Sequence, residues 1–245
     1  MRIARLLGAD GDVVHARWAA DGWTPIEDPY DAFAAGRPPA DLDAVVVVGE
    51  PLAPSDPLVV VGIAQNGPRH ESPVQAWLKS PRSVVASGET VTLRSDAGTT
   101  VAEGEIAVVI GRDTAGLTAA NAQDYVLGVT AVNDLSSPDR SAFDPRNFEA
   151  KSGDGYTPLG PWIDTDAAID DVALALRVDG ALVVDAGARS LPVAIRDCLA
   201  YVAGWMRLGP GDVVMTGAPV AQAPIAPGAV VEVEVAGMRL VTPTA

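Results

Sequence analysis

Cysteine, lysine and histidine are scarce in this 245-residue chain, and long apolar runs are missing. The only cysteine is Cys198, so the chain can form no internal disulfide and fits a reducing compartment. No apolar run approaches the ~18 residues that a membrane span needs. The N-terminal residues carry charge but no following apolar stretch of signal-peptide length. We therefore expect a cytoplasmic protein with no membrane partner.

Basic residues are also few compared with acidic ones. The chain has 32 acidic and 17 basic residues, which gives a net charge of -15. The summed field repels polyanions, so nucleic acid is not an expected partner. An anionic substrate would need a bound cation or a few placed basic groups to hold it.

Glycine and proline are abundant, at 24 and 20 residues, whereas aromatic residues make up only 5%. This composition predicts many turns between short strands rather than a bundle of long helices. The 48% hydrophobic content is enough for a sizeable core. A Pro-rich stretch at residues 51–57 suggests a boundary, so we expect a small N-terminal domain at residues 1–55 and a larger domain at residues 56–245.

Short apolar runs predict the strands of a β-rich fold. They lie at residues 45–48, 58–63, 91–93, 106–110, 126–132, 172–178, 182–184, 213–215 and 230–235. Two turn signals predict hairpins, namely the segment Gly8–Asp12 and the dipeptide Asp179-Gly180. Helical spacing predicts a short helix over residues 117–125 with a Thr118 cap, and a longer helix over residues 191–205.

Glu103 and Glu105 stand two residues apart on a predicted strand, where the period of two points both carboxylates to the same side. Acidic pairs with this spacing also occur at 10/12, 41/43, 164/166 and 232/234, so a solvated strand face is an alternative. Glu105 differs because it leads directly into the apolar run Ile-Ala-Val-Val-Ile. A carboxylate beside a buried strand is normally paired, protonated or bound to a metal.

Four separated segments together resemble the fumarylacetoacetate hydrolase family. They are Glu103-Gly-Glu105-Ile-Ala-Val-Val-Ile-Gly, then Tyr125 to Asp134, then Lys151-Ser152 with Pro158-Leu159-Gly160-Pro161-Trp162, and finally Leu208 to Pro219. The last segment is similar to the family's L-x-P-G-D-v-i-x-T-G-T-P. The resemblance covers about residues 58 to 240, and the family includes 2-hydroxyhepta-2,4-diene-1,7-dioate isomerase-like and acylpyruvase-like proteins.

The resemblance implies a mainly β (α+β) fold, a sandwich-like roll with a few short helices and a small N-terminal β domain. It also implies that Glu103, Glu105 and Asp134 are metal ligands. An all-oxygen site of this kind suits Mg²⁺, with Mn²⁺ as the alternative.

The chain has 15 arginines but only two lysines, and both lysines fall inside matched segments. Lys151 resembles the family's substrate-side lysine, which would hold a carboxylate or an enolate oxygen. Lys79 is a second expected substrate contact. For both lysines the alternative is an ordinary surface position. Thr216, with Gly217 beside it, resembles the family's threonine that binds the substrate carboxylate, and a plain turn at the end of a strand is its alternative.

Two segments depart from the family pattern. The family's G-L-N-Y-x-x-H is replaced by Gly-Ile-Ala-Gln-Asn-Gly-Pro-Arg-His at residues 62–70, so the histidine lies two places late. His70 and Glu71 are nevertheless the candidates for the pair that activates water. After Asp134 the family's S-A-R-D-x-Q becomes Ser-Ser-Pro-Asp-Arg-Ser, so Arg140 is the expected substitute for the family's substrate-binding arginine.

The resemblance implies an enzyme that depends on a divalent metal and acts on a small-molecule carboxylate, a 2-oxo acid or a 1,3-dicarbonyl compound. Its reaction would be C–C bond hydrolysis, or keto-enol isomerisation through a stabilised enolate, in the catabolism of aromatic compounds. The alternatives are a 2-oxo acid decarboxylase of the oxaloacetate type and a catalytically impaired member that binds metal and serves a binding role. The family also implies a homodimer.

Overall fold

The computed structural model describes residues 1–20, 22–43, 47–218 and 221–245. The larger of its two sheets contains β1 (Arg2–Gly8), β2 (Val13–Ala19), β3 (Gly22–Ile26), β4 (Val47–Val48), β5 (Val60–Gln65), β6 (Val74–Lys79), β7 (Val84–Ala86), β8 (Thr100–Ile110), β9 (Val126–Asn133), β10 (Thr157–Asp164), β13 (Val213–Met215) and β14 (Gln222–Ile225). The smaller sheet contains β11 (Ala173–Val178), β12 (Ala181–Gly187), β15 (Val230–Val235) and β16 (Met238–Pro243). The helices are α1 (Pro29–Ala34) and α2 (Ile195–Trp205), with single 3₁₀ turns at Pro81–Ser83, Ala122–Tyr125, Pro138–Arg140, Ile169–Asp171 and Ala188–Ser190.

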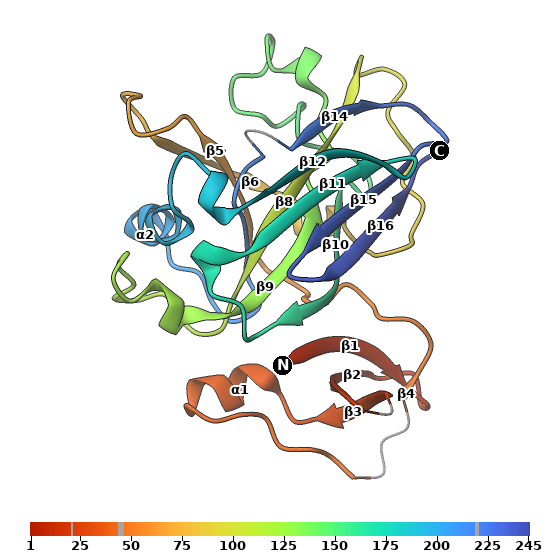
Figure 1. Cartoon of the computed structure of the whole chain (residues 1–245), viewed down its shortest axis with the longest axis vertical. Helices are drawn as coiled ribbons and strands as arrows, with labels where there is room; N and C mark the ends of the chain where they lie inside the picture. The colour runs from red at the N-terminus through yellow and green to blue at the C-terminus, as the bar shows by residue number, and fades with distance from the viewer. Residues whose placement is uncertain (21, 44–46, 219–220) are drawn as a thin grey trace.

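The predicted mainly β fold with few short helices is confirmed. The main path of the larger sheet runs β3-β2-β1-β10-β9-β8-β13-β5-β6, and the smaller sheet runs β12-β11-β15-β16. The smaller sheet covers β8 and β9 (Figure 1). Between the sheets lies the main apolar core, which includes Ile106, Val108, Val129, Ala131, Leu174, Leu176, Val231 and Val233. The smaller sheet and this core therefore cover one face of the two long central strands, β8 and β9.

The N-terminal segment forms the predicted hairpin, with β1 and β2 joined across the Gly8–Asp12 turn. Helix α1 follows β3, and its first turn is capped by the Asp28 carboxylate, which accepts hydrogen bonds from the N–H groups of Tyr30 and Asp31. Strand β1 pairs antiparallel with β10, so β1, β2 and β3 extend the larger sheet. The division at residue 55 remains a prediction. Of the predicted strand at 45–48, residues 45 and 46 lie outside the described residues, and Val47–Val48 form β4.

The smaller sheet agrees closely with its sequence pattern. In β15 the valines Val231, Val233 and Val235 are buried, and the residues between them are half-buried. The Asp179-Gly180 turn joins β11 to β12, and both residues have positive φ, at 51° and 76°. Such a pair is typical of a tight two-residue hairpin turn.

Three local predictions need correction. Residues 117–125 form only one 3₁₀ turn, at Ala122–Tyr125, because the Asn121 N–H donates to the Thr118 carbonyl oxygen and the Asp124 N–H to the Asn121 carbonyl oxygen, which closes tighter turns than those of an α-helix. Residues 91–93 contain no strand, only an isolated bridge from Val91 to Thr244. The predicted helix at 191–205 begins four residues late, at Ile195.

No helix in the described part of the chain is long and apolar enough to cross a membrane.

Cys198 lies on the inner face of α2 and is fully buried. Burial, with smaller contributions from Asp197 and Asp170, raises the pKa of its thiol to about 12. We therefore expect the native protein at pH 8 to react very slowly with a thiol reagent, because the thiolate is the reactive form. The reagent should label one thiol per chain once guanidinium chloride unfolds the protein. Rapid stoichiometric labelling of the native protein would contradict this burial.

Candidate metal centre

Three carboxylates converge where β8 and β9 run side by side. Glu103 and Glu105 lie on β8, and Asp134 directly follows β9. The Asp134 N–H donates to the Glu103 carbonyl oxygen at 2.8 Å, which continues the pairing of the two strands. One carboxylate oxygen from each residue lies within 4.8 Å of the others. The structure thus brings the three predicted ligands together, with Glu105 and Asp134 buried and Glu103 nearly so.

Lys151 bridges two of these carboxylates. Its Nζ donates to Glu103 Oε2 at 2.6 Å and to Asp134 Oδ2 at 2.8 Å. Burial would lower the pKa of Lys151, but the negative charges of Asp134, Glu103 and Glu105 outweigh burial and raise it. The ammonium group also lies 5.1 Å from the centre of the Trp77 ring. Lys151 is therefore a fixed positive charge at the cluster.

Lys79 reaches Asp134 from the buried side. Its Nζ donates to Asp134 Oδ1, to the Tyr156 carbonyl oxygen at 2.6 Å and to the Leu135 carbonyl oxygen at 3.3 Å. Burial lowers the pKa of Lys79, and Asp134 opposes this shift. All three N–H donors of the ammonium group are used within the protein. This geometry differs from the expected contact with a substrate, because no donor is left for a ligand.

The charges of the cluster do not balance. Burial would raise the pKa of Asp134, but the ammonium groups of Lys151 and Lys79 outweigh it and lower the pKa. Glu105 makes no ion pair within the described residues, and its Oε2 accepts one hydrogen bond, from the Gly217 N–H at 2.7 Å. Burial, and then the charges of Asp134 and Glu103, raise the pKa of Glu105 well above its ordinary value. Three carboxyl groups face two ammonium groups, so ionisation of all three would leave one negative charge without a partner in a buried site, and the raised pKa of Glu105 reflects that cost.

Thr216 and Gly217 form the neighbouring wall, directly after β13. The Thr216 hydroxyl donates to the Ile106 carbonyl oxygen at 2.8 Å. Gly217 has a φ of 91°, and a Cβ atom there would lie 2.7 Å from the Ile63 carbonyl oxygen. Only glycine fits this backbone, which presents its N–H to Glu105. Residues 219 and 220, at the end of the matched segment, lie outside the described residues.

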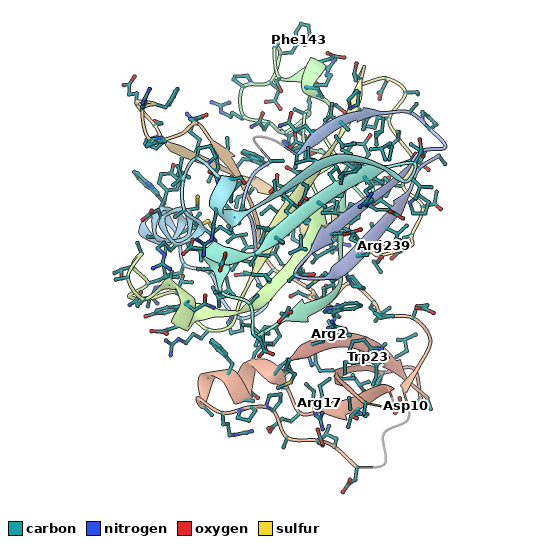
Figure 2. All side chains as sticks on the ribbon, in the orientation of Figure 1. Arg2, Asp10, Arg17, Trp23, Phe143 and Arg239 are labelled. Atoms are coloured by element: carbon teal, nitrogen blue, oxygen red, sulfur yellow. The ribbon has the colours of Figure 1, made fainter. Side chains whose placement is uncertain are left out.

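His70, Glu71 and Arg140 are not brought to the carboxylates. His70 and Glu71 are exposed in the connection between β5 and β6, where the Ser72 N–H donates to His70 Nδ1 at 3.0 Å. No hydrogen bond or ion pair within the described ranges joins them to the cluster. Arg140 pairs instead with Glu149, with Nε 2.7 Å from Oε2, on an outer loop whose tip carries Phe143 (Figure 2). The catalytic roles of His70 and Glu71 and the substrate-binding role of Arg140 remain predictions.

Two side chains that shape the site could not be recognised from the sequence pattern. Trp77 on β6 lies opposite Gly62 on β5, and its ring covers Gly62 on the side of Lys151. Gln65 ends β5, and its amide donates to the Thr216 carbonyl oxygen at 2.7 Å and accepts from the Val193 N–H at 2.8 Å. These contacts follow from the pairing of β5 with β6 and from the position of Gln65 at the end of β5, which no local sequence pattern records.

Replacing Gly62 by alanine should destabilise the protein, because the added Cβ would lie 2.4 Å from the Trp77 ring. We expect a loss of about 1–3 kcal/mol in the free energy of unfolding, measured by urea denaturation. Gly204→Ala is the matched control, since its Cβ would meet open space on the exposed side of α2 and should stabilise by about 0.5–1 kcal/mol. Equal stability of the Gly62 variant and the wild type would show that Trp77 does not lie against this strand.

Comparison with known proteins settles the family. Residues 48–243 match the sequence profile described as Fumarylacetoacetate (FAA) hydrolase C-terminal, which spans far more than half of the chain. The chain belongs to the fumarylacetoacetate hydrolase family. The resemblance found in four short segments is thereby confirmed over most of the sequence.

Relatives from this family of enzymes carry isomerase, decarboxylase and hydrolase names. The crystal structure of 5-carboxymethyl-2-hydroxymuconate delta-isomerase from Mycobacterium smegmatis is 30% identical, with a TM-score of 0.89 over 100% of this chain and 99% of that chain. An uncharacterized protein of Archaeoglobus fulgidus is 31% identical over 97% of this chain and 93% of its own length. A 4-hydroxyphenylacetate degradation bifunctional isomerase/decarboxylase of Salmonella dublin is 34% identical over 67% of this chain, which spans only 40% of that enzyme.

Proposed function

We propose that this chain is an enzyme that depends on a divalent metal and acts on a 2-oxo acid or 1,3-dicarbonyl carboxylate through an enolate. The observation that carries the proposal is the convergence of the buried carboxyl groups of Glu103, Glu105 and Asp134, of which Glu105 has no ammonium partner within the described residues. A buried carboxylate without a partner is costly, and a cation removes that cost.

The donor set fits a hard cation. The cluster contains carboxylate oxygens and, within the described residues, no histidine or cysteine. Oxygen ligands suit Mg²⁺ and Mn²⁺, which are the metals we propose. When bound, such a cation polarises the carbonyl oxygen of a substrate and makes an adjacent proton easier to remove.

Each residue of the site has a distinct task in this proposal. Lys151 supplies a positive charge for the oxygen on which enolate charge develops, and its ion pairs with Glu103 and Asp134 hold that charge in place. Lys79 holds the Asp134 carboxylate in position by donating a hydrogen bond to its Oδ1. Thr216 and Gly217 form the wall against which the substrate carboxylate would lie.

The positions of His70 and Glu71 favour isomerisation or 2-oxo acid decarboxylation over C–C bond hydrolysis. Hydrolysis requires a general base within hydrogen-bond reach of the water that attacks the carbonyl carbon, whereas the other two reactions pass through a stabilised enolate and need no activated water. Both residues are exposed and make no contact with the cluster in the described structure. Relatives carry isomerase, decarboxylase and hydrolase names, so the preference rests on the positions of these two residues. Hydrolysis remains the alternative.

A substrate panel tests the proposed reaction. Oxaloacetate, an acylpyruvate and a 2-hydroxy-dienoate should be assayed with Mg²⁺ and with Mn²⁺, followed by a chelator. We expect turnover of the dienoate or of oxaloacetate that stops when the chelator removes the metal. Metal binding without turnover of any of the three would instead favour the binding role. Turnover that resists the chelator would contradict the metal dependence.

We also propose that the chain is a cytoplasmic homodimer without nucleic-acid or membrane partners. The dimer rests on the family, and the absence of polyanionic partners rests on the net charge of -15. Light scattering that gives a monomer mass would remove the dimer.

A further inference from the structure

A cavity lies where strands β1, β2 and β3 meet the smaller sheet, and none of its lining residues belongs to the metal centre. The cavity has a volume of about 530 Å³. It is lined by Trp18 of β2, Trp23 of β3 and Trp162 of β10, three of the five tryptophans in the chain. Arg2 of β1 and Arg239 of β16 also line it, and Figure 2 shows Arg2 and Trp23 below Arg239.

The three indole rings meet at steep angles. The Trp18 and Trp23 ring centres are 5.0 Å apart with planes at 76°, and those of Trp23 and Trp162 are 6.4 Å apart at 56°. Trp18 remains 48% exposed. An exposed tryptophan beside a cavity is typical of a binding surface rather than of a closed core.

The charge of this cavity opposes that of the whole chain. Its charged lining residues are Arg2, Arg239 and Glu50, a net of one positive charge in a chain of net charge -15. The Arg2 guanidinium lies 5.2 Å from the Trp162 ring centre and makes no ion pair within the described ranges. Arg239 reaches only Glu232, with Nη1 and Oε1 3.4 Å apart at the surface. Two guanidinium groups are thus available to an anion.

We propose that this cavity binds a small aromatic carboxylate, with its ring against the indole faces and its carboxylate on Arg2 and Arg239. The volume lies in the range of ~300–1,000 Å³ that is usual for small-molecule sites. Guanidinium groups match the planar carboxylate, and the indole rings favour a planar aromatic body over an aliphatic one. The site is separate from the metal centre, so it does not depend on the proposed reaction.

Tryptophan fluorescence tests the proposal directly, because the rings that line the cavity report on it. The titration uses the Trp205→Phe background, which removes an 80% exposed tryptophan outside the cavity. The probes are phenylacetate, phenylacetamide, which has the same ring without the charge, and propionate, which has the charge without the ring. We expect a saturable change with phenylacetate, binding of phenylacetamide weaker by at least roughly tenfold, and no saturation with propionate.

Surface variants then locate the site. Arg2→Ala and Arg239→Ala should each weaken phenylacetate binding, and Arg189→Ala, an exposed arginine outside the cavity, should leave it unchanged. Equal linear quenching by all three probes would overturn the proposal, as would full affinity in both cavity variants. A fluorescence change that follows protein concentration without any probe would show that a second copy of the chain covers the cavity, which would also overturn it.

Discussion

Replacing Glu105 by glutamine is expected to abolish binding of Mg²⁺ and Mn²⁺ in a calorimetric titration, and with it all metal-dependent turnover. Glutamine keeps the shape of the side chain and can still accept the hydrogen bond from the Gly217 N–H. It removes the one carboxylate charge that no ammonium group balances, and a hard cation requires that charge. Glu103→Ala and Asp134→Ala should abolish binding as well, because each removes a further oxygen ligand.

The control for this prediction is Glu234→Gln, which alters the other Glu-x-Glu pair of the strands. Glu234 lies half-buried on β15 and pairs with Arg177, so its variant should bind metal like the wild type.

The free energy of unfolding, measured in urea, distinguishes a variant that has lost only the metal site from one that has lost the fold. Without metal, Glu105→Gln should unfold at the same urea concentration or a higher one, whereas Asp134→Ala should lose about 3–5 kcal/mol because it leaves the buried Lys79 ammonium unpaired. Unchanged metal affinity in Glu105→Gln would remove Glu105 from the site.

Replacing Lys151 by methionine should lower kcat by about 10²–10³ for every substrate that the enzyme turns over. The methionine fills a similar volume but removes the charge that lies 2.6 Å from Glu103 and 2.8 Å from Asp134. All three candidate reactions build negative charge on the same oxygen, so all should be slowed alike. Steady-state kinetics over the substrate panel measures the effect. A loss confined to one substrate would show that Lys151 recognises that substrate and does not stabilise the enolate.

The matched comparison for Lys151 is His70→Ala on the same panel. General-base help of ~10²–10⁴ is needed to make hydroxide but not to protonate an enolate that is already held. Because His70 is exposed and bonded only within its own loop, we expect isomerisation and decarboxylation to be unchanged. If an acylpyruvate is cleaved and His70→Ala leaves the rate intact, the role of this histidine in water activation is wrong. A large loss confined to cleavage would instead establish hydrolysis as the reaction.

Sequence patterns predicted the strands and turns that depend on residues close together in the chain. The alternation in β15 and the Asp179-Gly180 hairpin depend on neighbouring residues and were confirmed. The short helix expected over residues 117–125 was wrong because the backbone there closes i→i+3 turns, with the Asn121 N–H on the Thr118 carbonyl oxygen and the Asp124 N–H on the Asn121 carbonyl oxygen. Periodicity alone does not distinguish an α-helix from such a run of tighter turns.

The contacts of the metal centre could not be predicted from local patterns, because they join residues that are distant in the sequence. Lys79 and Asp134 are 55 residues apart, and Glu105 and Gly217 are 112 residues apart. The spacing of Glu103 and Glu105 pointed to a shared face, but only the pairing of β8 with β9 places Asp134 beside them. The buried position of Lys79 follows from the register of β5 with β6, which no local pattern records.

Glu103, Glu105 and Asp134 are expected to hold one divalent cation together, and anomalous diffraction from crystals grown with Mn²⁺ tests this directly. The structure predicts one strong anomalous peak per chain between the three carboxylates, within about 2.0–2.6 Å of an oxygen from each. A peak bound by other residues, or an empty cluster with Lys151 still bridging Glu103 and Asp134 at saturating Mn²⁺, would contradict the account.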